Sequence, residues 1–407
     1  MLVASLPPLP VGGAERQALL LARTLKEAGI SIIFLTPGQT GLKTEDSIDG
    51  IRVFRIHSIW NRLFEFVSGM KKKSGISLVR IEYDDQLEIT NRITRKVGWP
   101  TVIFYRLFIW KAKWMIRKKS IHFDIVHAHT MEWSAIVAAR LGAFFGKPVL
   151  IKDSTMNGFE SLERFPHGKE LQQFIVERSH FVAMTHSIEE NLKSAGVPAS
   201  GITRIPNGIP TTVPVVRQAD ENLVLFVGNL YQQPAKGIDI LLKAWKSVIV
   251  EFPSARLFIA GKGDLGEYER YIESLGISGR VQLLGACEEI GEWYQKAALF
   301  VLPSRREGMS NALMEAMLHG LPCIATAISG NVDLIEDGVN GRLVPPANVD
   351  SLATAIISLL SDSHTSKALG EAARQTILTH YDIRKIAGKY QALYQAVLEG
   401  RQLQSIG

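Results

Sequence analysis

Short apolar runs alternate with segments of helical periodicity along most of this sequence, and that alternation constrains the fold more than any other feature. Runs such as residues 51–56 and 299–302 are rich in Val, Ile, Leu and Phe, as buried strands are. The segments between them repeat apolar residues at helical spacing and close on Gly or Pro. This pattern is typical of βα units that feed a parallel sheet, so the sequence predicts an α/β protein.

The expected strands fall into two series, separated by a proline-containing stretch at residues 209–214. A chain of 407 residues also exceeds the roughly 250–300 residues at which a single core stops growing. We expect two Rossmann-like βαβ domains facing across a central cleft, residues 1–208 and 209–379, with the C-terminal helix within 380–407 able to pack back on the first. The predicted strands are residues 2–6, 31–36, 51–57, 125–129, 149–152 and 180–185, then 223–227, 256–260, 281–284, 299–303 and 322–325.

The amino-acid composition excludes several other classes of protein. With 46% hydrophobic and 21% charged residues the chain is neither disordered nor fibrous. Its two cysteines lie far apart in the sequence and outside any Cys/His cluster, which predicts neither a disulfide framework nor a zinc site. We find no secretory signal pattern and no uncharged stretch of spanning length, so we expect a cytoplasmic protein that is soluble or peripheral on the inner face of the cell membrane.

The positive charge is local. Residues 1–200 carry 27 basic and 19 acidic side chains, whereas residues 201–407 carry 19 and 21. Residues 92–119 contain nine Lys or Arg, no acid and six aromatic residues. Such a local excess does not indicate nucleic-acid binding.

Within this stretch the sequence predicts a helix that meets an anionic membrane surface. The alternative is an ordinary domain helix whose aromatic residues pack inside while its lysines stay in water. At helical spacing we expect one apolar face and one basic face. The apolar face would hold Ile103, Leu107, Trp110 and Trp114, and the basic face Arg106, Lys113 and Arg117.

Two glycine-rich turns follow predicted strands. Gly12 and Gly13 precede a helix whose free N–H groups suit an anion, although a plain tight turn explains them as well. Residues 261–266, GKGDLG, match G-x-G-x-x-G. A nicotinamide-cofactor site must therefore be weighed, but a loop with three permissive glycines is the stronger interpretation of a match in mid-chain.

The segment from Glu307 to Glu315 reads EGMSNALME and opens a helix after a strand. Backbone N–H groups of Met309, Ser310 and Asn311 would face a phosphate, and Glu315 would accept hydrogen bonds from a ribose diol. The alternative is that Glu307 caps the helix and Glu315 is merely solvated.

Lys236 precedes another helix, directly after the first strand of the second series. A cation at a helix N-terminus opposes the helix dipole, so Lys236 indicates an anionic partner such as a diphosphate. His127 and His129 end a strand of the first series with both imidazoles on one face. We interpret them as hydrogen-bonded structure rather than metal ligands, because no third ligand lies at a recognisable spacing.

Taken together these motifs resemble the retaining glycosyltransferases of family 4, glycosyl transferases group 1, which have the two-domain GT-B fold. The resemblance covers nearly the whole chain. It rests on GGAER at 12–16, DIVHAHT at 124–130, IPNGI at 205–209, VGNL at 227–230 with KG at 236–237, EGMSNALMEAM at 307–317 and DGVNGRLVPP at 337–346.

The resemblance implies transfer of a sugar from a UDP- or GDP-sugar to a glycan or lipid-linked acceptor, with no cofactor and no metal. It implies a hexosyltransferase of cell-surface polysaccharide, lipopolysaccharide or glycolipid synthesis that retains the anomeric configuration. The implied site holds Glu307 at the donor sugar, Glu315 on the ribose and Lys236 on the diphosphate. Gly12 and Gly13 would approach the phosphate, and His129 would line the reaction centre.

One position departs from the family pattern. Asn229 stands where the family usually has Arg, so the diphosphate site lacks a charge unless Arg305 or Arg306 replaces it. The chain also lacks a D-x-D motif, which disfavours the metal-dependent single-domain transferases. Two other functions remain open: a GT-B enzyme of another type, such as a nucleotide-sugar epimerase, and a membrane-binding homologue without transfer activity.

Overall fold

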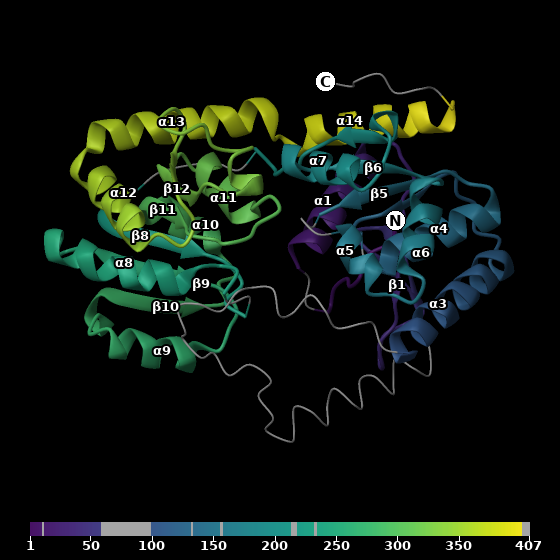
Figure 1. Cartoon of the computed structure of the whole chain (residues 1–407), viewed down its shortest axis with the longest axis horizontal. Helices are drawn as coiled ribbons and strands as arrows, with labels where there is room; N and C mark the ends of the chain where they lie inside the picture. The colour runs from purple at the N-terminus through teal and green to yellow at the C-terminus, as the bar shows by residue number, and fades with distance from the viewer. Residues whose placement is uncertain are drawn as a thin grey trace. The chain divides into compact units, whose positions relative to one another are not determined.

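The computed structural model describes residues 1–9, 12–57, 99–131, 133–154, 158–212, 218–231 and 234–400. The chain divides into two compact units, each with its own sheet (Figure 1). Unit 1 comprises Met1–Ala183, Glu189–Arg204 and Gly388–Gly407. Unit 2 comprises Met184–Ile188 and Ile205–Ala387.

Seven strands and an isolated bridge form the sheet of unit 1 within the described residues. Leu2 bridges in parallel to both Leu35 and Ala128, and so it joins a three-stranded sheet to a four-stranded one. The strands are β1 (Ile33–Pro37), β2 (Glu45–Ile48), β3 (Ile51–Ile56), β4 (Val126–Ala128), β5 (Val149–Asp153), β6 (Ser179–Ala183) and β7 (Ile202–Arg204). Their order is β2-β3-β1, the Leu2 bridge, then β4-β5-β6-β7, with β2 antiparallel to β3.

The helices of unit 1 cover this sheet with apolar faces. Ala18, Leu19 and Ala22 of the first helix pack with Phe34 and Val53 in one buried cluster. The helices are α1 (Gly13–Glu27), α3 (Trp99–Lys118), α4 (Trp133–Phe145), α5 (Gly158–Glu163) and α6 (Gly168–Val176). Two further helices, α7 (His186–Ser194) and α14 (Ile383–Leu398), begin in residues of unit 2 and continue in unit 1.

Unit 2 has a six-stranded parallel sheet in the order β10-β9-β8-β11-β12-β13. The middle residues of its central strands are fully buried, as Leu225 and Phe300 show, and these positions need apolar residues on both faces. The strands are β8 (Asp220–Val227), β9 (Arg256–Ala260), β10 (Val281–Gly285), β11 (Ala297–Leu302), β12 (Cys323–Thr326) and β13 (Arg342–Val344). The helices are α8 (Ile238–Glu251), α9 (Leu265–Ser274), α10 (Ile290–Lys296), α11 (Asn311–Leu318), α12 (Val349–Ser361) and α13 (Ser363–His380).

Both sheets reverse their strand order at one point. In unit 2 the first strand, β8, lies between β9 and β11. In unit 1 the Leu2 bridge lies between β1 and β4. Loops that leave the carboxyl ends of such neighbouring strands diverge to opposite sides of a sheet and leave room for a ligand. The fold therefore points to the loops after β8 and β11 and to the end of β4.

The structure corrects the predicted strand at residues 2–6. Leu2 forms bridges, whereas Ala4 lies in a bend and Pro7 and Pro8 follow in a turn. Proline supplies no backbone N–H, so this run cannot extend the ladder. Val3 and Leu6 are still buried, which explains the apolar pattern.

The structure also corrects the predicted faces of the helix within residues 99–118. Trp110 and Trp114 are exposed on the same side as Arg106 and Arg117, instead of opposite to them. The buried side of α3 is formed by Val102, Tyr105, Phe108, Ala112, Met115 and Ile116. Residues 92–98 of the predicted membrane-binding stretch lie outside the described residues.

No helix in the described ranges combines the length and the apolar character that crossing a bilayer requires.

Candidate functional site

The loops after β8 and β11 bring a lysine and a glutamate together in unit 2. Lys236 lies just before α8, whose N-cap is Gly237, and Glu307 lies in the loop that follows β11. The Lys236 Nζ is 2.5 Å from the Glu307 Oε2. The exposed fractions of the two side chains are only 12% and 14%. Because the pair is largely shielded from water, its attraction is stronger than that of a surface ion pair.

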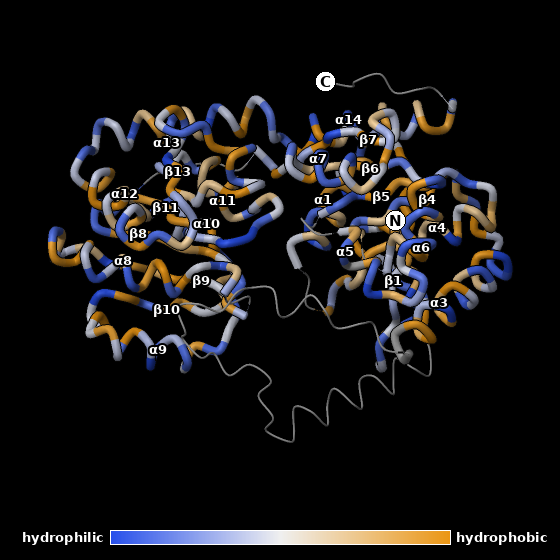
Figure 2. Tube along the Cα trace, in the orientation of Figure 1, coloured by the Kyte–Doolittle hydropathy of each residue, from blue (hydrophilic) through white to orange (hydrophobic). Residues whose placement is uncertain are grey.

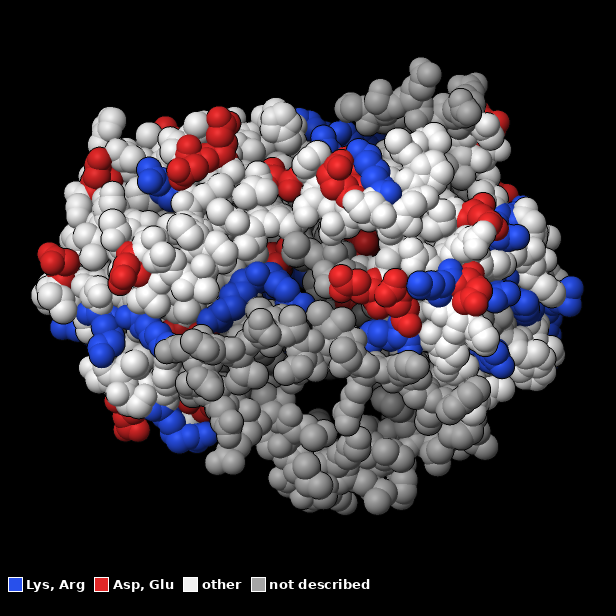
Figure 3. Space-filling view, viewed as in Figure 1, with Lys and Arg blue, Asp and Glu red and all other residues white. Residues whose placement is uncertain are grey.

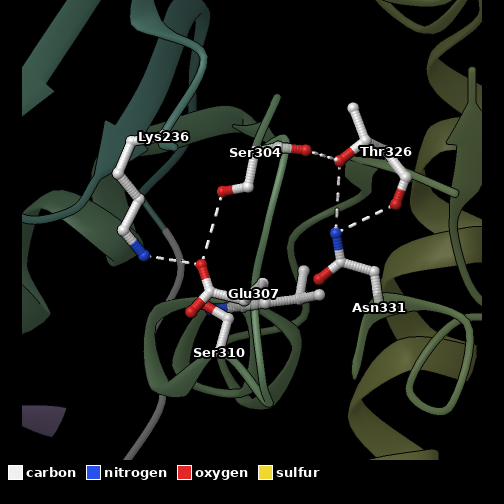
Figure 4. A network of polar contacts seen from close by, with 7 residues as sticks. Lys236, Ser304, Glu307, Ser310, Thr326 and Asn331 are labelled. Carbon is white, nitrogen blue, oxygen red and sulfur yellow. Dashed lines mark hydrogen bonds and ion pairs between the residues drawn. The ribbon is translucent and has the colours of Figure 1, made fainter. Parts of the chain in front are cut away.

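Ser304 completes this arrangement. Its Oγ donates to the same Glu307 Oε2 at 3.3 Å, so one carboxylate oxygen has two donors (Figure 4). The backbone carbonyl of Ser304 accepts from the Thr326 Oγ1 at 2.5 Å. Ser304 thus connects Glu307 to the residue at the end of β12.

Asn331 extends the network to the loop after β12. Its Nδ2 donates to the Thr326 backbone carbonyl at 2.9 Å, while its Oδ1 has no hydrogen-bond partner among the described residues (Figure 4). The next residue back, Gly330, has φ of +24°, and a Cβ there would lie 1.6 Å from the Gly308 carbonyl oxygen. The loops after β11 and β12 are therefore in backbone contact. Sequence reasoning missed Ser304, Thr326 and Asn331, although Ser304 and Thr326 lie where parallel strands end.

The start of α11 differs from the prediction in one respect. Ser310 is the N-cap, and its Oγ accepts from the Leu313 N–H at 3.3 Å, so Glu307 is not the helix cap. Met309 is buried, and its sulfur accepts from the Asn207 N–H. Asn311 is the first helical residue.

Glu315 is half-buried rather than merely solvated. Its Oε2 accepts from the hydroxyl of Tyr294 at 3.2 Å. Tyr294 is 1% exposed, so the carboxylate has a fixed neighbour on one side. A carboxylate oxygen can accept several hydrogen bonds, which leaves capacity for a diol.

Arg305, one of the two arginines that could replace the charge missing at Asn229, forms an ion pair with Asp239. Arg305 donates to both carboxylate oxygens of Asp239, at 2.7 and 2.6 Å. A bidentate pair of this kind is strong, so Arg305 is a structural residue. Asn229 itself is exposed, and its Oδ1 accepts from the Tyr231 N–H at 3.1 Å. Arg306 is exposed.

Packing explains two glycines of the G-x-G-x-x-G match. A Cβ at Gly261 would lie 1.7 Å from the Gly228 carbonyl oxygen, and one at Gly263 would lie 2.3 Å from the Leu230 Cβ. The loop after β9 is thus pressed against the loop after β8, and only glycine fits. This supports the loop interpretation over a nicotinamide-cofactor site.

His127 and His129 lie in unit 1 at the end of β4. Their rings stack with centroids 4.2 Å apart, which confirms that they share one face. Each residue is 2% exposed. The His127 Nδ1 is 2.8 Å from the hydroxyl of Tyr394 on α14, whereas neither ring nitrogen of His129 has a partner in the described structure.

Burial decides the protonation of this histidine pair. It lowers the pKa of His127 and of His129 well below the ordinary value, with the Lys152 charge contributing in the same direction, so both imidazoles are neutral at pH 7. Burial also lowers the pKa of Lys152 to about 7. Lys152 lies on β5, next to β4, and sequence reasoning missed it because nothing in its spacing marks it as buried.

Gly12 is the N-cap of α1, and Gly13 is the first helical residue. The Gly12 N–H donates to the Glu15 Oε2 at 3.0 Å. Glu15 thus satisfies one of the N–H groups that was expected to face an anion.

Among the described residues no group of three or more His, Cys, Asp or Glu side chains is placed to hold a metal ion. Two ion pairs lie at the ends of β8 and β11, Lys236 with Glu307 and Arg305 with Asp239.

Comparison with known proteins agrees with this architecture. The solved structure of the Anabaena protein HepE in complex with UDP-glucose superposes with a TM-score of 0.70 at 17% identity, over 97% of this chain and 98% of that one. Two Rossmann-like units of this kind define the GT-B class of glycosyltransferases. Residues 11–213 match the model of Glycosyltransferase Family 4, and residues 221–362 match that of Glycosyl transferases group 1. The chain belongs to glycosyltransferase family 4, as its motifs predicted.

Two curated relatives are similar to this chain over most of its length. The UDP-Gal:alpha-D-GlcNAc-diphosphoundecaprenol alpha-1,3-galactosyltransferase of Escherichia coli is 28% identical over 300 residues, 68% of this chain and 76% of that protein. The phosphatidyl-myo-inositol mannosyltransferase of Mycolicibacterium smegmatis is 25% identical over 409 residues, 95% of this chain and 90% of that protein. The protein is therefore a glycosyltransferase.

Proposed function

We propose that this glycosyltransferase moves a hexosyl group from a UDP- or GDP-sugar to a glycan or lipid-linked acceptor, with retention of anomeric configuration and without a metal. The observation that carries the proposal is the Lys236–Glu307 ion pair at the carboxyl ends of β8 and β11. A lysine ammonium beside a helix start suits a diphosphate.

The donor would be held within unit 2. Lys236 would leave Glu307 and face the diphosphate, which is a better partner because it carries more negative charge. Glu307 would then face the donor sugar, held in place by Ser304. Glu315 would accept from the ribose hydroxyls. Asn229 and the backbone N–H groups of Met309, Ser310 and Asn311 would complete the contacts.

The transfer step would break the bond between the anomeric carbon and the diphosphate oxygen. A hydroxyl oxygen of the acceptor would bond to the same face of that carbon, and its proton would pass to the departing diphosphate. Lys236 would stabilise the charge that develops on the leaving group, which is the role a divalent cation has in other transferases.

Unit 1 would contribute the acceptor side. A neutral His129 can accept or donate one hydrogen bond without introducing charge beside a developing oxocarbenium ion. Gly12 and Gly13 would bring backbone close to the phosphate. The relatives support a lipid-linked acceptor, since one is named for a diphosphoundecaprenol substrate and the other for phosphatidyl-myo-inositol. Such acceptors fit a cytoplasmic protein that is peripheral on the inner face of the cell membrane.

Donor binding can be tested without knowing the acceptor. A panel of UDP-, GDP- and ADP-sugars should yield one that raises the melting temperature, because a ligand at 100 times its Kd adds about 2.7 kcal/mol to the free energy of unfolding. Lys236→Ala should abolish the rise, whereas Lys246→Ala, an exposed lysine of α8, should preserve it. A rise of equal size in the Lys236→Ala protein would refute the donor site.

Retention and metal independence have separate tests. The glycosidic bond of the product, examined by NMR, should carry the anomeric configuration of the donor; an inverted product would exclude a retaining mechanism. Transfer should also proceed at an unchanged rate after treatment with EDTA. A rate restored only by a divalent cation would contradict the role given to Lys236.

A further inference from the structure

The outer side of α3 carries exposed tryptophans among cations. Trp110 and Trp114 are 62% and 54% exposed, which is unusual for the largest apolar side chain. With a rotation of about 100° per residue they lie on one stripe with Lys113, Arg117 and Lys118. We call these five residues the α3 stripe. The tube of α3 alternates between hydrophilic and hydrophobic colours, as expected for a two-faced helix (Figure 2).

The opposite side of α3 fixes the orientation of the stripe. Phe108 and Ala112 are 1% and 0% exposed, and the Phe108 ring meets the Trp133 ring of α4 edge-on at 5.4 Å. The helix is therefore anchored in the core of unit 1 by its other face. The two exposed tryptophans take no part in that packing, so the core does not explain them.

Cations cover the aromatic rings of this surface. The Lys118 Nζ lies 4.6 Å from the centre of the Trp114 ring. The Phe144 ring of α4 is 40% exposed and lies under the Lys113 Nζ at 4.0 Å and the Arg117 guanidinium at 4.5 Å. The aromatic surface thus continues from α3 onto α4, where the Phe144 ring also has cations above it.

Other lysines on the same helix or just beyond it have hydrogen-bond or ion-pair partners among the described residues. Lys111 donates to the His57 carbonyl, and Lys119 pairs with Glu45. Within the described ranges no ion pair involves Lys113, Arg117 or Lys118. Burial and the charges of Arg140 and Arg117 lower the pKa of Lys113, so like charges crowd together here. Figure 3 shows Lys and Arg side chains along the margin of unit 1 at which Figure 1 places α3 and α4.

We propose that the α3 stripe, together with Phe144 and Arg140 of α4, docks on the surface of an anionic lipid bilayer. Trp110, Trp114 and Phe144 enter the headgroup layer, and the cations lie over lipid phosphates. The stripe runs along the C-terminal part of α3 over about 12 Å, at a rise of 1.5 Å per residue. Indole rings and snorkelling Lys or Arg side chains are the residues that favour the boundary between headgroups and acyl chains.

Vesicle sedimentation tests this docking with the full chain and no sugar substrate. We expect binding to phosphatidylcholine vesicles that contain phosphatidylglycerol, weak binding to pure phosphatidylcholine, and release by high salt. Replacing Lys113, Arg117 and Lys118 by Gln should lower the partition coefficient about 100-fold. The matched control replaces Lys246, Arg270 and Lys367 by Gln, three exposed cations of unit 2, and should lower it no more than about twofold.

Trp110→Ser with Trp114→Ser should lower the partition coefficient about tenfold at unchanged net charge. The blue shift of tryptophan fluorescence on vesicle binding should also disappear in this variant. Circular dichroism and melting temperature verify that each variant is folded.

Absence of binding at low salt would overturn the proposal, as would equal loss in the α3 variant and the unit 2 control. A preference for a single-stranded oligonucleotide over anionic vesicles would overturn it too. The test is independent of transfer activity, so failure of the proposed donor site would leave its outcome unchanged.

Discussion

Unit 1 and unit 2 both place polar side chains at or just beyond the ends of strands where the sheet order reverses, yet these side chains are charged in unit 2 and neutral in unit 1. In unit 2, Lys236 and Glu307 lie 2.5 Å apart as a charged pair with some access to water. In unit 1, His127 and His129 are almost fully buried, and their lowered pKa keeps them neutral. A largely buried side chain stays charged when an oppositely charged side chain lies beside it. A buried ionisable side chain without such a neighbour becomes neutral.

The largest expected effect is a pH-dependent loss of stability that originates in unit 1. The unfolded pKa of each histidine is near 6.5 and the folded pKa is lower, so the unfolded state binds more protons as the pH falls. Between pH 6.5 and 5 each histidine should lower the free energy of unfolding by about 2 kcal/mol. Urea denaturation at the two pH values measures this.

A histidine variant separates this loss from other titrations. His129→Asn should remove about a quarter of the pH dependence between pH 6.5 and 5, because burial also lowers the pKa of His127, of His180 (to about 4) and of the Met1 amino group (to about 5). Lys152 does not interfere, since its contribution, which also rises with pH, lies in the range between about pH 7 and pH 10.5. An unchanged slope in the variant would show that the imidazoles are not buried as neutral groups.

Glu307→Ala tests the Lys236–Glu307 ion pair of unit 2. It should lower kcat/KM for transfer about 100-fold, because the carboxylate at the donor sugar is lost and Lys236 loses its partner. The control is Glu289→Ala, an exposed glutamate at the N-cap of α10, which should keep kcat/KM within about twofold. Comparable activity in both variants would remove Glu307 from the site.

Gly261→Ala should break the backbone contact that supports the loop carrying Lys236. The added Cβ would meet the Gly228 carbonyl oxygen at 1.7 Å, and we expect a loss of about 2 kcal/mol or more in the free energy of unfolding. Gly279→Ala has no atom within 4 Å of its Cβ, so its effect should stay within about 0.5 kcal/mol. Thermal melting of the two variants compares them directly.

The smallest effect concerns the link between β4 and α14. Tyr394→Phe removes the hydroxyl that pairs with His127 and should cost about 1 kcal/mol. Tyr390→Phe is the matched control, because the Tyr390 hydroxyl is buried with no partner among the described residues. If Tyr390→Phe proves the more costly change, the His127 contact does not hold α14.

The sequence predicted most of the strands and helices because their apolar spacing is local. It missed β2, β7 and β13, which are three or four residues long and carry too few side chains to show a period. It placed Trp110 and Trp114 on a different face of α3 from Arg106 and Arg117, because hydrophobicity alone does not tell which of several apolar stripes meets the core.

The sequence likewise predicted some features of the candidate site and missed others. The sequence identified Lys236, Glu307, Glu315 and the histidine pair from their positions at strand ends and helix starts. It also offered Arg305 as a replacement cation, and the structure engages Arg305 with Asp239 instead. Which oppositely charged side chains form an ion pair depends on the conformation of the loops. The spacing of residues in the sequence does not specify that conformation.

By itself the sequence determined the α/β class, the two series of strands and the family, because periodicity and motif spacing are properties of neighbouring residues. Only the tertiary structure decided that Glu307 has Lys236 and Ser304 as donors, that His127 and His129 are too buried to be charged, and that the tryptophans of α3 share a face with its cations. The reason is physical: burial and charge pairing depend on distances between residues far apart in the chain, and folding alone sets those distances.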